Sequence, residues 1–318
     1  MIASPVGDWF PRQTFQATDF VQAELLAAKT CSVSVVIPAR NEQATVGGVV
    51  SQIRSELAEL VDEVIVIDSD STDDTARIAG DSGATVWAAR DIRPDLDSVP
   101  GKGEALWKAL FVAKGEICVF IDADLTEWGP HFVTGLLGPL FADENTLLVK
   151  GFYDRLADDL PEAAGEPLPQ GGRVTELVGR PLLNLYWPEL AAVVQPLAGE
   201  WAIRRRLIEA LSIPVGYGVE FATLVDTFAQ HGLDAIAQVD LGRRGHRHQN
   251  VHDLGLMAAE ILATGLRRLP GESVDVSGPS GVLWQFDRSL SEPWVARAVP
   301  LAERPPAMLI DGYRSVAC

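Results

Sequence analysis

The sequence predicts an α/β protein with a mixed, mostly parallel sheet flanked by helices. Between residues 32 and 124, short β-branched runs alternate with segments of helical periodicity. Each apolar run ends in a polar cluster, a proline or a glycine, as a strand does where the chain turns into the next element. This β-α-β-α-β-α-β order favours a parallel sheet, because each crossover helix must pack on one of its faces.

The first expected strand is the run "SVSVVIPA" at 32–39, and a helix at 41–57 follows it. That helix places apolar side chains at helical spacing: Val46, Val49, Val50, Ile53 and Leu57. The pattern repeats with strands at 63–67, 84–89 and 116–124 and helices at 73–80 and 101–115. An additional short helix is expected at 17–29, ahead of the first strand.

The alternation weakens after residue 150, although strands at 147–154 and 235–242 and a helix at 217–232 are still expected. The stretch 155–176 is rich in proline, glycine and acidic residues, which predicts a loop able to close over a site. A long helix at 251–269 has a broad apolar face, and irregular chain follows it. We expect this C-terminal helical and irregular extension, 251–318, to form a homodimer.

The bulk composition excludes several kinds of partner. The chain has 318 residues, 47% of them hydrophobic, and a formal net charge of −18 at pH 7. It can therefore bury a substantial core, and its charge repels nucleic acid and anionic membranes, so neither is expected as a partner. The three cysteines show no metal spacing, the N-terminus lacks signal-peptide features, and no apolar run approaches the roughly 18 residues needed to cross a bilayer. We expect a cytoplasmic protein.

Two aspartates, Asp122 and Asp124, directly follow an apolar strand in "CVFIDADLTE". Alternate residues of a strand share a face, so this spacing brings two carboxylates to one cation. Carboxylate oxygens are preferred ligands of Mg²⁺ and Mn²⁺, which often bridge a protein to a substrate phosphate. The structural alternative is a surface turn with solvated aspartates.

Polar residues also follow the first two strands, at Glu42 and at Asp68 and Ser69. Ligands of open α/β sheets bind at the carboxyl ends of the strands, where these residues are expected. No G-x-G-x-x-G opens the first helix and no P-loop signature occurs, which counts against NAD binding and P-loop phosphoryl transfer.

Three further features are weak signals when each is taken alone. Lys102 lies between two glycines, a pattern suited to a diphosphate or to an ordinary surface loop. "GRRGHRHQN" at 242–250 is a basic segment in an acidic chain, suited to phosphate and metal or simply to solvent. Glu220 is either a catalytic carboxylate or an acid favoured by the start of a helix.

Together these segments resemble a nucleotide-sugar glycosyltransferase of the Rossmann-like GT-A fold. "VVIPARNEQATV", "VIVIDSDSTDDT", "GKGEALWKAL" and "FIDADL" occur in its order and spacing. The second half, with "GGRVTELVGRPLLNLYWPEL", "QPLAGEWAIRR", "PVGYGVEFATLVD" and "VDLGRRGHRHQ", is similar to the glucosyl-3-phosphoglycerate synthases of actinobacteria. The turn "DSDS" departs from the commoner glycine-bearing form on the uracil side.

The resemblance implies glucose transfer with retention from UDP-glucose to the 2-hydroxyl of 3-phosphoglycerate, with Mg²⁺ or Mn²⁺, for methylglucose lipopolysaccharide biosynthesis. It implies an N-terminal arm and helix at 1–30, a nucleotide-sugar-binding domain at 31–150, an acceptor-binding and catalytic part at 151–250, and the extension at 251–318. Asp124 and His246 are the implied metal ligands. The implied catalytic residues are Glu220, Asp122 and Leu197. The implied donor site comprises Pro38, Ala39, Glu42, Ser69, Lys102, Asp122, Ala123, Tyr217 and Arg244. Ala198 and Gly199 are also implied to line the glucose. The implied acceptor site comprises Gly172, Arg173, Val174 and Thr175.

Three alternatives stay open at this point. The same fold could use GDP-mannose and give mannosyl-3-phosphoglycerate, which pocket size rather than motif would decide. A sugar nucleotidyltransferase also uses acidic metal ligands, but it usually carries a glycine-rich N-terminal loop, which "PARNEQATVGG" does not provide. A non-catalytic sensor would bind UDP-glucose without needing the arginine- and histidine-rich segment.

Overall fold

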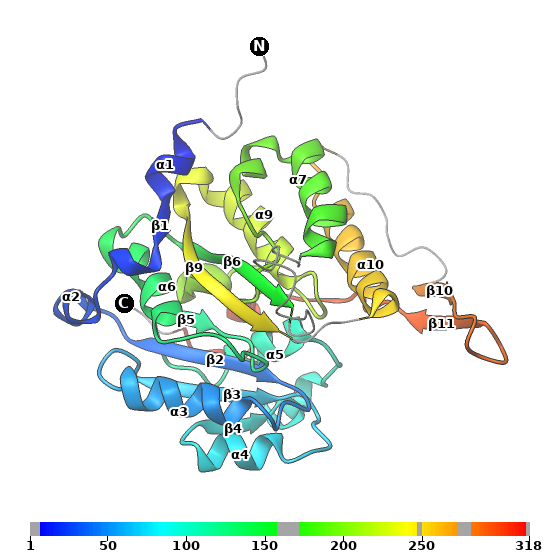
Figure 1. Ribbon diagram of the computed structural model, residues 1–318, viewed down its shortest axis with the longest axis horizontal. Helices are drawn as coiled ribbons and strands as arrows, with labels where there is room; N and C mark the ends of the chain where they lie inside the picture. Colours follow the sequence, from blue (N-terminus) through cyan, green and yellow to red (C-terminus); the bar gives the residue numbers. More distant parts are fainter. Residues whose placement is uncertain (1–6, 158–171, 247–249, 272–280, 316–318) are drawn as a thin grey trace, which may run out of the picture.

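The computed structural model describes residues 7–157, 172–246, 250–271 and 281–315. One eight-stranded sheet runs through the centre, in the order β1-β9-β6-β7-β5-β2-β3-β4 (Figure 1). Its strands are β1 Thr14–Gln16, β2 Val33–Ala39, β3 Glu63–Asp68, β4 Thr85–Ala88, β5 Ile117–Phe120, β6 Leu148–Ala157, β7 Trp201–Arg204 and β9 Ile236–His246.

Seven of these strands point the same way, which confirms the mostly parallel sheet predicted from the sequence. β7 alone is reversed, and it pairs antiparallel with both β5 and β6. Parallel pairing of β2 with β3 and β5 brings Ala39 level with Asp68 at the carboxyl ends of the strands, which form one edge of the sheet. The residues that follow β2, β3 and β5 therefore share this edge.

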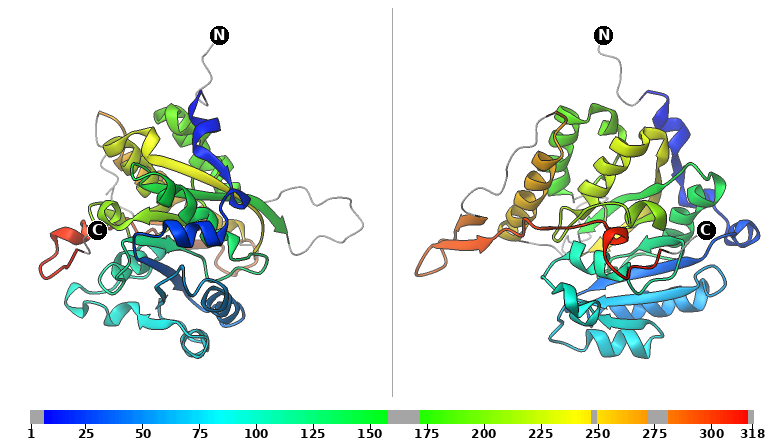
Figure 2. Two further views of the ribbon diagram at one scale, coloured as in Figure 1. Left: turned by 90° about the vertical axis from the view of Figure 1, so that its left-hand side faces the viewer. Right: turned by 180° about the vertical axis from the view of Figure 1, so that it is seen from behind.

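Helices cover both faces of the sheet, as Figures 1 and 2 show. Alternate residues of β2 pack on opposite sides, since Val36 belongs to one apolar cluster and Val35 and Ile37 to the other. α5 (Lys102–Ala109), α9 (Val219–His231) and α10 (Val251–Arg267) contribute to the first cluster, with α7 (Arg180–Tyr186). α3 (Val46–Glu56), α4 (Thr75–Asp81) and α6 (His131–Ala142) contribute to the second.

The remaining α-helices and β-strands are short. They are α1 Trp9–Gln13, α2 Gln22–Ala28, α8 Arg205–Ile208, β8 Ile213–Pro214, β10 Val282–Phe286, β11 Trp294–Ala298 and β12 Glu303–Arg304. A π-helical turn, Thr175–Gly179, leads directly into α7. Within the described ranges, no helix has both the length and the apolar character needed to cross a membrane.

Most expected elements are present with shorter bounds, and some expectations were wrong. The helix expected at 41–57 begins only at Val46, and the strand expected at 116–124 ends at Phe120. The chain after 269 was expected to be irregular, yet β10 and β11 form an antiparallel hairpin that projects from the body (Figures 1 and 2). Most of the expected closing loop, 158–171, lies outside the described residues.

Candidate active site

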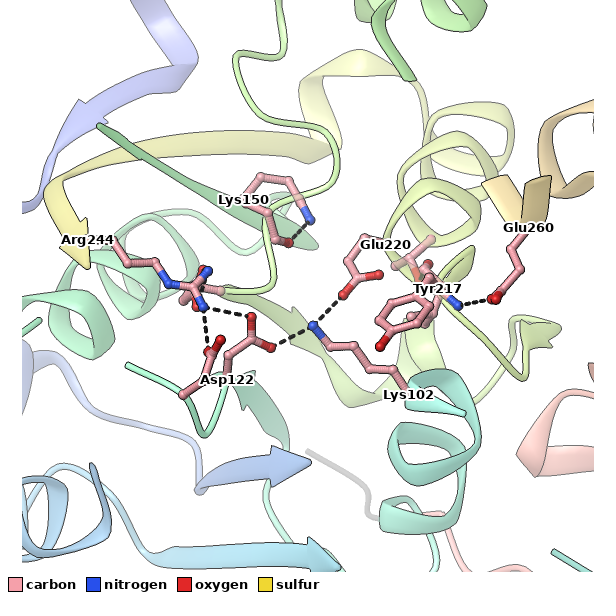
Figure 3. A network of polar contacts seen from close by, with 12 residues as sticks. Lys102, Asp122, Lys150, Tyr217, Glu220, Arg244 and Glu260 are labelled. Atoms are coloured by element: carbon pink, nitrogen blue, oxygen red, sulfur yellow. Dashed lines mark hydrogen bonds and ion pairs between the residues drawn. The ribbon is translucent and has the colours of Figure 1, made fainter. Parts of the chain in front are cut away.

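The aspartates that follow β5 lie inside a network of charged side chains (Figure 3). Lys102, the first residue of α5, donates from Nζ to Oδ1 of Asp122 at 2.6 Å and lies 2.8 Å from Oε1 of Glu220. Asp122 therefore shares one ammonium with a glutamate from the first turn of α9. This pairing brings together three of the expected site residues, from α5, from α9 and from the loop after β5.

Arg244, on β9, reaches the same aspartates from the other side. Its Nη2 donates to Asp122 Oδ2 at 3.1 Å and to Asp124 Oδ1 at 2.8 Å. Its Nη1 donates to the Tyr153 hydroxyl at 2.7 Å and lies 3.2 Å from Glu200. Lys102 and Arg244 thus balance the carboxylates that the apolar strand leads into.

The environment fixes the charge states of these groups. Burial alone would lower the pKa of Lys102, but its pairing with Asp122 and Glu220 outweighs burial and raises the pKa well above its usual value. Burial would also lower the pKa of Arg244, but the nearby negative charges, that of Glu200 most of all, raise the pKa well above its usual value. Burial raises the pKa of Glu200 and of the Tyr217 phenol. Both cations therefore stay charged at neutral pH.

The glycines beside Lys102 allow close backbone packing, which was not predicted. The helix start packs against the chain at 214–216: Gly103 N donates to Gly216 O at 3.2 Å and Glu104 N to Val215 O at 2.9 Å. A Cβ at Gly103 would lie 1.8 Å from Pro214 O. This glycine therefore permits close approach of protein backbone, and it positions Lys102 opposite the loop that carries Tyr217.

The expected uridine residues lie at the ends of two neighbouring strands. Pro38 and Ala39 close β2, and Ser69 follows β3 and donates from its N–H to Ala39 O at 2.9 Å. Glu42 N donates to the Thr75 hydroxyl at 2.8 Å, which ties the first loop to α4. These four residues therefore lie at the end of the sheet that leads to Asp122, and their contact with uridine stays a prediction.

The expected acceptor residues begin a helical run. Gly172 has φ +71°, Arg173 is exposed, and Val174 and Thr175 are buried where the π-helical turn begins. The run contacts the segment that carries Leu197, because Arg180 donates from Nη2 to Val194 O at 2.7 Å. Arg180 also pairs with Glu176, so its contacts are structural.

The expected metal ligands are only partly described. Asp124 is partly exposed beside Asp122, and both offer carboxylate oxygens that suit a hard divalent cation. His246 ends β9, but its side chain lies outside the described residues, as do Arg247 and His248. Among the side chains that the structure describes, no three metal-binding groups gather at one point.

Four residues near the site were not predicted: Tyr153, Lys150, Glu200 and Glu260. Lys150 and Glu200 are fully buried charges inside apolar runs, "LLVKGFY" and "PLAGEWAI". The same signal, a charge within an apolar strand, singled out Asp122. It could have identified both residues, whereas Tyr153 and Glu260 are partners that only the tertiary structure reveals.

Comparison with known proteins places this geometry in a family. A protein-family model described as glycosyl transferase family 2 matches residues 34–187. The glucosyl-3-phosphoglycerate synthase of Mycolicibacterium paratuberculosis is 42% identical over 314 residues, which cover 96% of this chain and 93% of that protein. That of Mycobacterium tuberculosis (strain CDC 1551 / Oshkosh) is 48% identical over 256 residues, covering 80% and 79%.

Solved structures agree in fold. The crystal structure of the M. tuberculosis glucosyl-3-phosphoglycerate synthase gives a TM-score of 0.81 at 43% identity, covering 93% of this chain and 98% of that chain. A structure of that enzyme in complex with Mn²⁺, UDP-glucose and phosphoglyceric acid also gives 0.81, at 44% identity and the same coverage. The chain therefore belongs to the glucosyl-3-phosphoglycerate synthases, a family of glycosyltransferases with the GT-A type of fold.

Proposed function

We propose that this protein transfers glucose from UDP-glucose to the 2-hydroxyl of 3-phospho-D-glycerate, with retention at the anomeric carbon and with Mg²⁺ or Mn²⁺. The observation that carries the proposal is the placement of Lys102 and Arg244 on either side of Asp122. Four carboxylates surround these two cations, those of Asp122, Asp124, Glu200 and Glu220, and this excess of negative charge suits a divalent cation that bridges the protein to a diphosphate. The relatives that bind UDP-glucose and phosphoglyceric acid support the same assignment.

The donor is proposed to lie along the edge formed by the ends of β2, β3 and β5. Its uridine would contact four residues of the first two strand ends: Pro38, Ala39, Glu42 and Ser69. Its diphosphate would meet Lys102, Arg244 and Tyr217, with Asp122 and Ala123 beneath it. This assignment follows the rule that ligands of open α/β sheets bind at the carboxyl ends of strands.

The metal is proposed to bind Asp124 and His246, with Asp122 beside them. The carboxylate pair fits a hard cation, and when bound the ion would offset charge on the departing diphosphate. Lys102 and Arg244 supply the protein's own share of that electrostatic stabilisation from fixed positions. Because both are held by carboxylates before the donor arrives, little reorganisation is needed during the reaction.

The acceptor is proposed to bind at Gly172, Arg173, Val174 and Thr175. The N–H groups of the first turn of a helical run have no partner within the helix and favour an anion. The guanidinium of Arg173 adds positive charge for the phosphate and carboxylate of 3-phosphoglycerate. Leu197 lies on the segment that Arg180 ties to this run, so the proposed sugar site adjoins the proposed acceptor site.

Glu220 is proposed to orient the glucosyl group. Its carboxylate is buried and held by Lys102, so one set of contacts positions both the sugar and the diphosphate. Retention requires either a protein nucleophile or front-face attack assisted by the leaving phosphate. Both routes use the same placement of donor and acceptor.

The test is product formation from 3-phosphoglycerate with UDP-glucose, ADP-glucose and GDP-mannose in parallel, each with Mg²⁺, Mn²⁺ or EDTA. A glucosylated product from UDP-glucose that disappears with EDTA is the expected result. A mannosylated product alone would show that the donor is GDP-mannose and not UDP-glucose. Nucleotide binding without transfer would show that the protein is not an enzyme of this kind.

We also propose that the protein is a homodimer of the cytoplasm that supplies methylglucose lipopolysaccharide biosynthesis. The dimer is supported by the hairpin of β10 and β11, which projects from the body and exposes Trp284, Phe286, Leu290 and Trp294. Apolar side chains gathered on a projecting arm usually mark an interaction site. The cytoplasmic location is supported by the sparse cysteines, of which Cys31 and Cys118 are free.

A further inference from the structure

Lys150 is a lysine buried in the middle of the molecule. It lies on β6 with only 1% of its surface exposed, and its Nζ donates to the carbonyl of Ala198 at 2.8 Å. The same ammonium lies 5.5 Å from the centroid of the Trp201 ring. Among the described residues, no carboxylate comes within ion-pair distance of it. Burying a charge without a direct counter-ion is costly, and this cost suggests that Lys150 has a functional role.

The carbonyl that Lys150 holds belongs to the segment 195–199, which separates the proposed donor and acceptor halves. Ala198 N donates to Gln195 O at 3.1 Å, which closes a turn. On the donor side the segment touches Asp122, since a Cβ at Gly199 would lie 2.2 Å from Asp122 Oδ2. A shift of Ala198 would therefore displace Leu197 on one side and Gly199 on the other.

The ammonium also contributes to the charge of the site. The carboxylates of Glu220 on α9, Glu200 before β7 and Asp122 after β5 lie close enough to act on it, as does the cation Lys102 on α5. These carboxylates are also the partners of Lys102 and Arg244. Lys150 therefore adds positive charge near these carboxylates without pairing with them, whereas Lys102 and Arg244 form ion pairs with them (Figure 3).

We propose that Lys150 is a positioning residue for the glucosyl group. It fixes the Ala198 carbonyl and so holds the segment 197–199 against Asp122, and its ammonium adds positive charge near Glu220. The inference rests on the proposed function, because that function places the glucose along this segment.

The proposal has a pH consequence. Burial lowers the pKa of Lys150 to about 8, with Glu220 opposing and Lys102 reinforcing the change. Lys150 therefore loses its proton as the pH rises through about 8, and both the Ala198 contact and the charge weaken. We expect kcat/KM for UDP-glucose to fall along this limb, because that parameter reports ionisations of the free enzyme.

The chain offers a matched control in Lys108. This lysine is also fully buried, donates to the carbonyls of Ile92 and Arg93 at 2.6 and 3.0 Å, and lies 6.0 Å from the centroid of the Trp107 ring. Its contacts are with the loop before α5 and not with the proposed sugar segment. A change there tests the cost of losing a buried ammonium without touching the site.

The experiment compares Lys150→Met and Lys108→Met in the full chain, measuring thermal stability, UDP binding, and kcat/KM between pH 6 and 10. Both variants should lower Tm, and both should bind UDP as the wild type does. Lys150→Met alone should lose about 100-fold in kcat/KM and lose the alkaline limb, since a misplacement of about 1 Å at a reacting centre costs that much. Equal activity losses in the two variants, or an unchanged pH profile in Lys150→Met, would overturn the proposal.

If Lys150→Met does not fold, Lys150→Arg carries the test, because arginine keeps the donor and stays charged across this range. It should retain part of the activity and show no limb near pH 8, and a limb at the unchanged pH would contradict the proposal. A wild-type enzyme that makes no glucosylated product would instead reject the proposed function, and the two failures are distinguishable.

Discussion

Glu260 accepts a hydrogen bond from the backbone N–H of Tyr217 at 2.6 Å, and this contact joins α10 to the loop that precedes α9 (Figure 3). The glutamate is almost fully buried. The same loop packs against the start of α5 through Gly216 O. The C-terminal helix therefore supports the proposed donor site directly, as well as extending the chain.

The stability of this contact should depend on pH. Burial raises the pKa of Glu260 from 4.5 to about 7, so the folded state favours the protonated form. The associated stability is fully present below pH 4.5 and is lost as the pH rises through about 7. Glu260→Gln keeps an acceptor oxygen and cannot ionise, so it should be more stable than the wild type at pH 8, by up to about 3 kcal/mol. Denaturant unfolding at pH 5 and pH 8 measures this, with exposed Glu59→Gln as the control. A difference in unfolding free energy between Glu260→Gln and the wild type that is the same at both pH values would show that the pKa of Glu260 is not raised in the fold.

The metal assignment predicts the behaviour of Asp124→Ala. The variant should stay folded, because Asp124 is partly exposed and Arg244 retains Asp122 and Glu200. Its activity should fall by at least about 100-fold, since even residues that only support a metal ligand cost 10- to 100-fold. Titration of Mn²⁺ in the presence of UDP should show weakened binding. Asp81→Ala, at the far end of α4, is the control, and Mn²⁺ binding that equals the wild type in Asp124→Ala would remove the metal role.

The acceptor assignment predicts a selective effect of Arg173→Ala. Loss of one charge-assisted hydrogen bond of about 1.5 to 3 kcal/mol should raise the KM for 3-phosphoglycerate by roughly 10- to 100-fold. The KM for UDP-glucose should stay within about 3-fold of the wild type, because the donor contacts are elsewhere. Steady-state kinetics with each substrate varied in turn distinguishes the two, with the exposed Arg206→Ala as the control. An unchanged KM for 3-phosphoglycerate would place the acceptor elsewhere.

The exposed hairpin predicts the oligomeric state. Replacing Trp284 and Trp294 together by serine removes two aromatic side chains that are 61% exposed, and should convert a dimer to a monomer in sedimentation velocity. The control is Leu309→Ser, which changes an apolar residue outside the hairpin that is 69% exposed. A wild type that already sediments as a monomer, or a double variant that remains dimeric, would contradict the proposed interface.

The regular half of the fold was predictable because each element there carries a strong local pattern. The apolar runs of β2, β3 and β5 are continuous and are followed by polar or turn-forming residues, so the sequence reveals them as buried strands. α6 was not predicted, since "HFVTGLLGPLFA" contains two glycines and Pro139, which break helical patterns in a sequence. β7 has only four residues, and its reversed direction depends on pairing with β5 and β6.

The site residues likewise divide into those that local sequence patterns predict and those that only tertiary packing reveals. Asp122, Asp124 and Lys102 follow strand or helix boundaries that the sequence reveals, so their shared edge could be inferred from topology. The partners of Arg244 could not, because Tyr153 and Glu200 lie 91 and 44 residues away along the chain. The contact of Glu260 with Tyr217 likewise depends on how α10 packs, which no local pattern encodes.

NMR of the product formed from ¹³C-labelled UDP-glucose and 3-phosphoglycerate with Mn²⁺ examines donor, acceptor and linkage in one spectrum. We expect one new anomeric signal in the α configuration, a correlation from that carbon to the 2-position of the glycerate, and no signal when EDTA replaces the metal. A β-anomer, a linkage to another atom, or labelled free glucose as the sole product would contradict the proposed function.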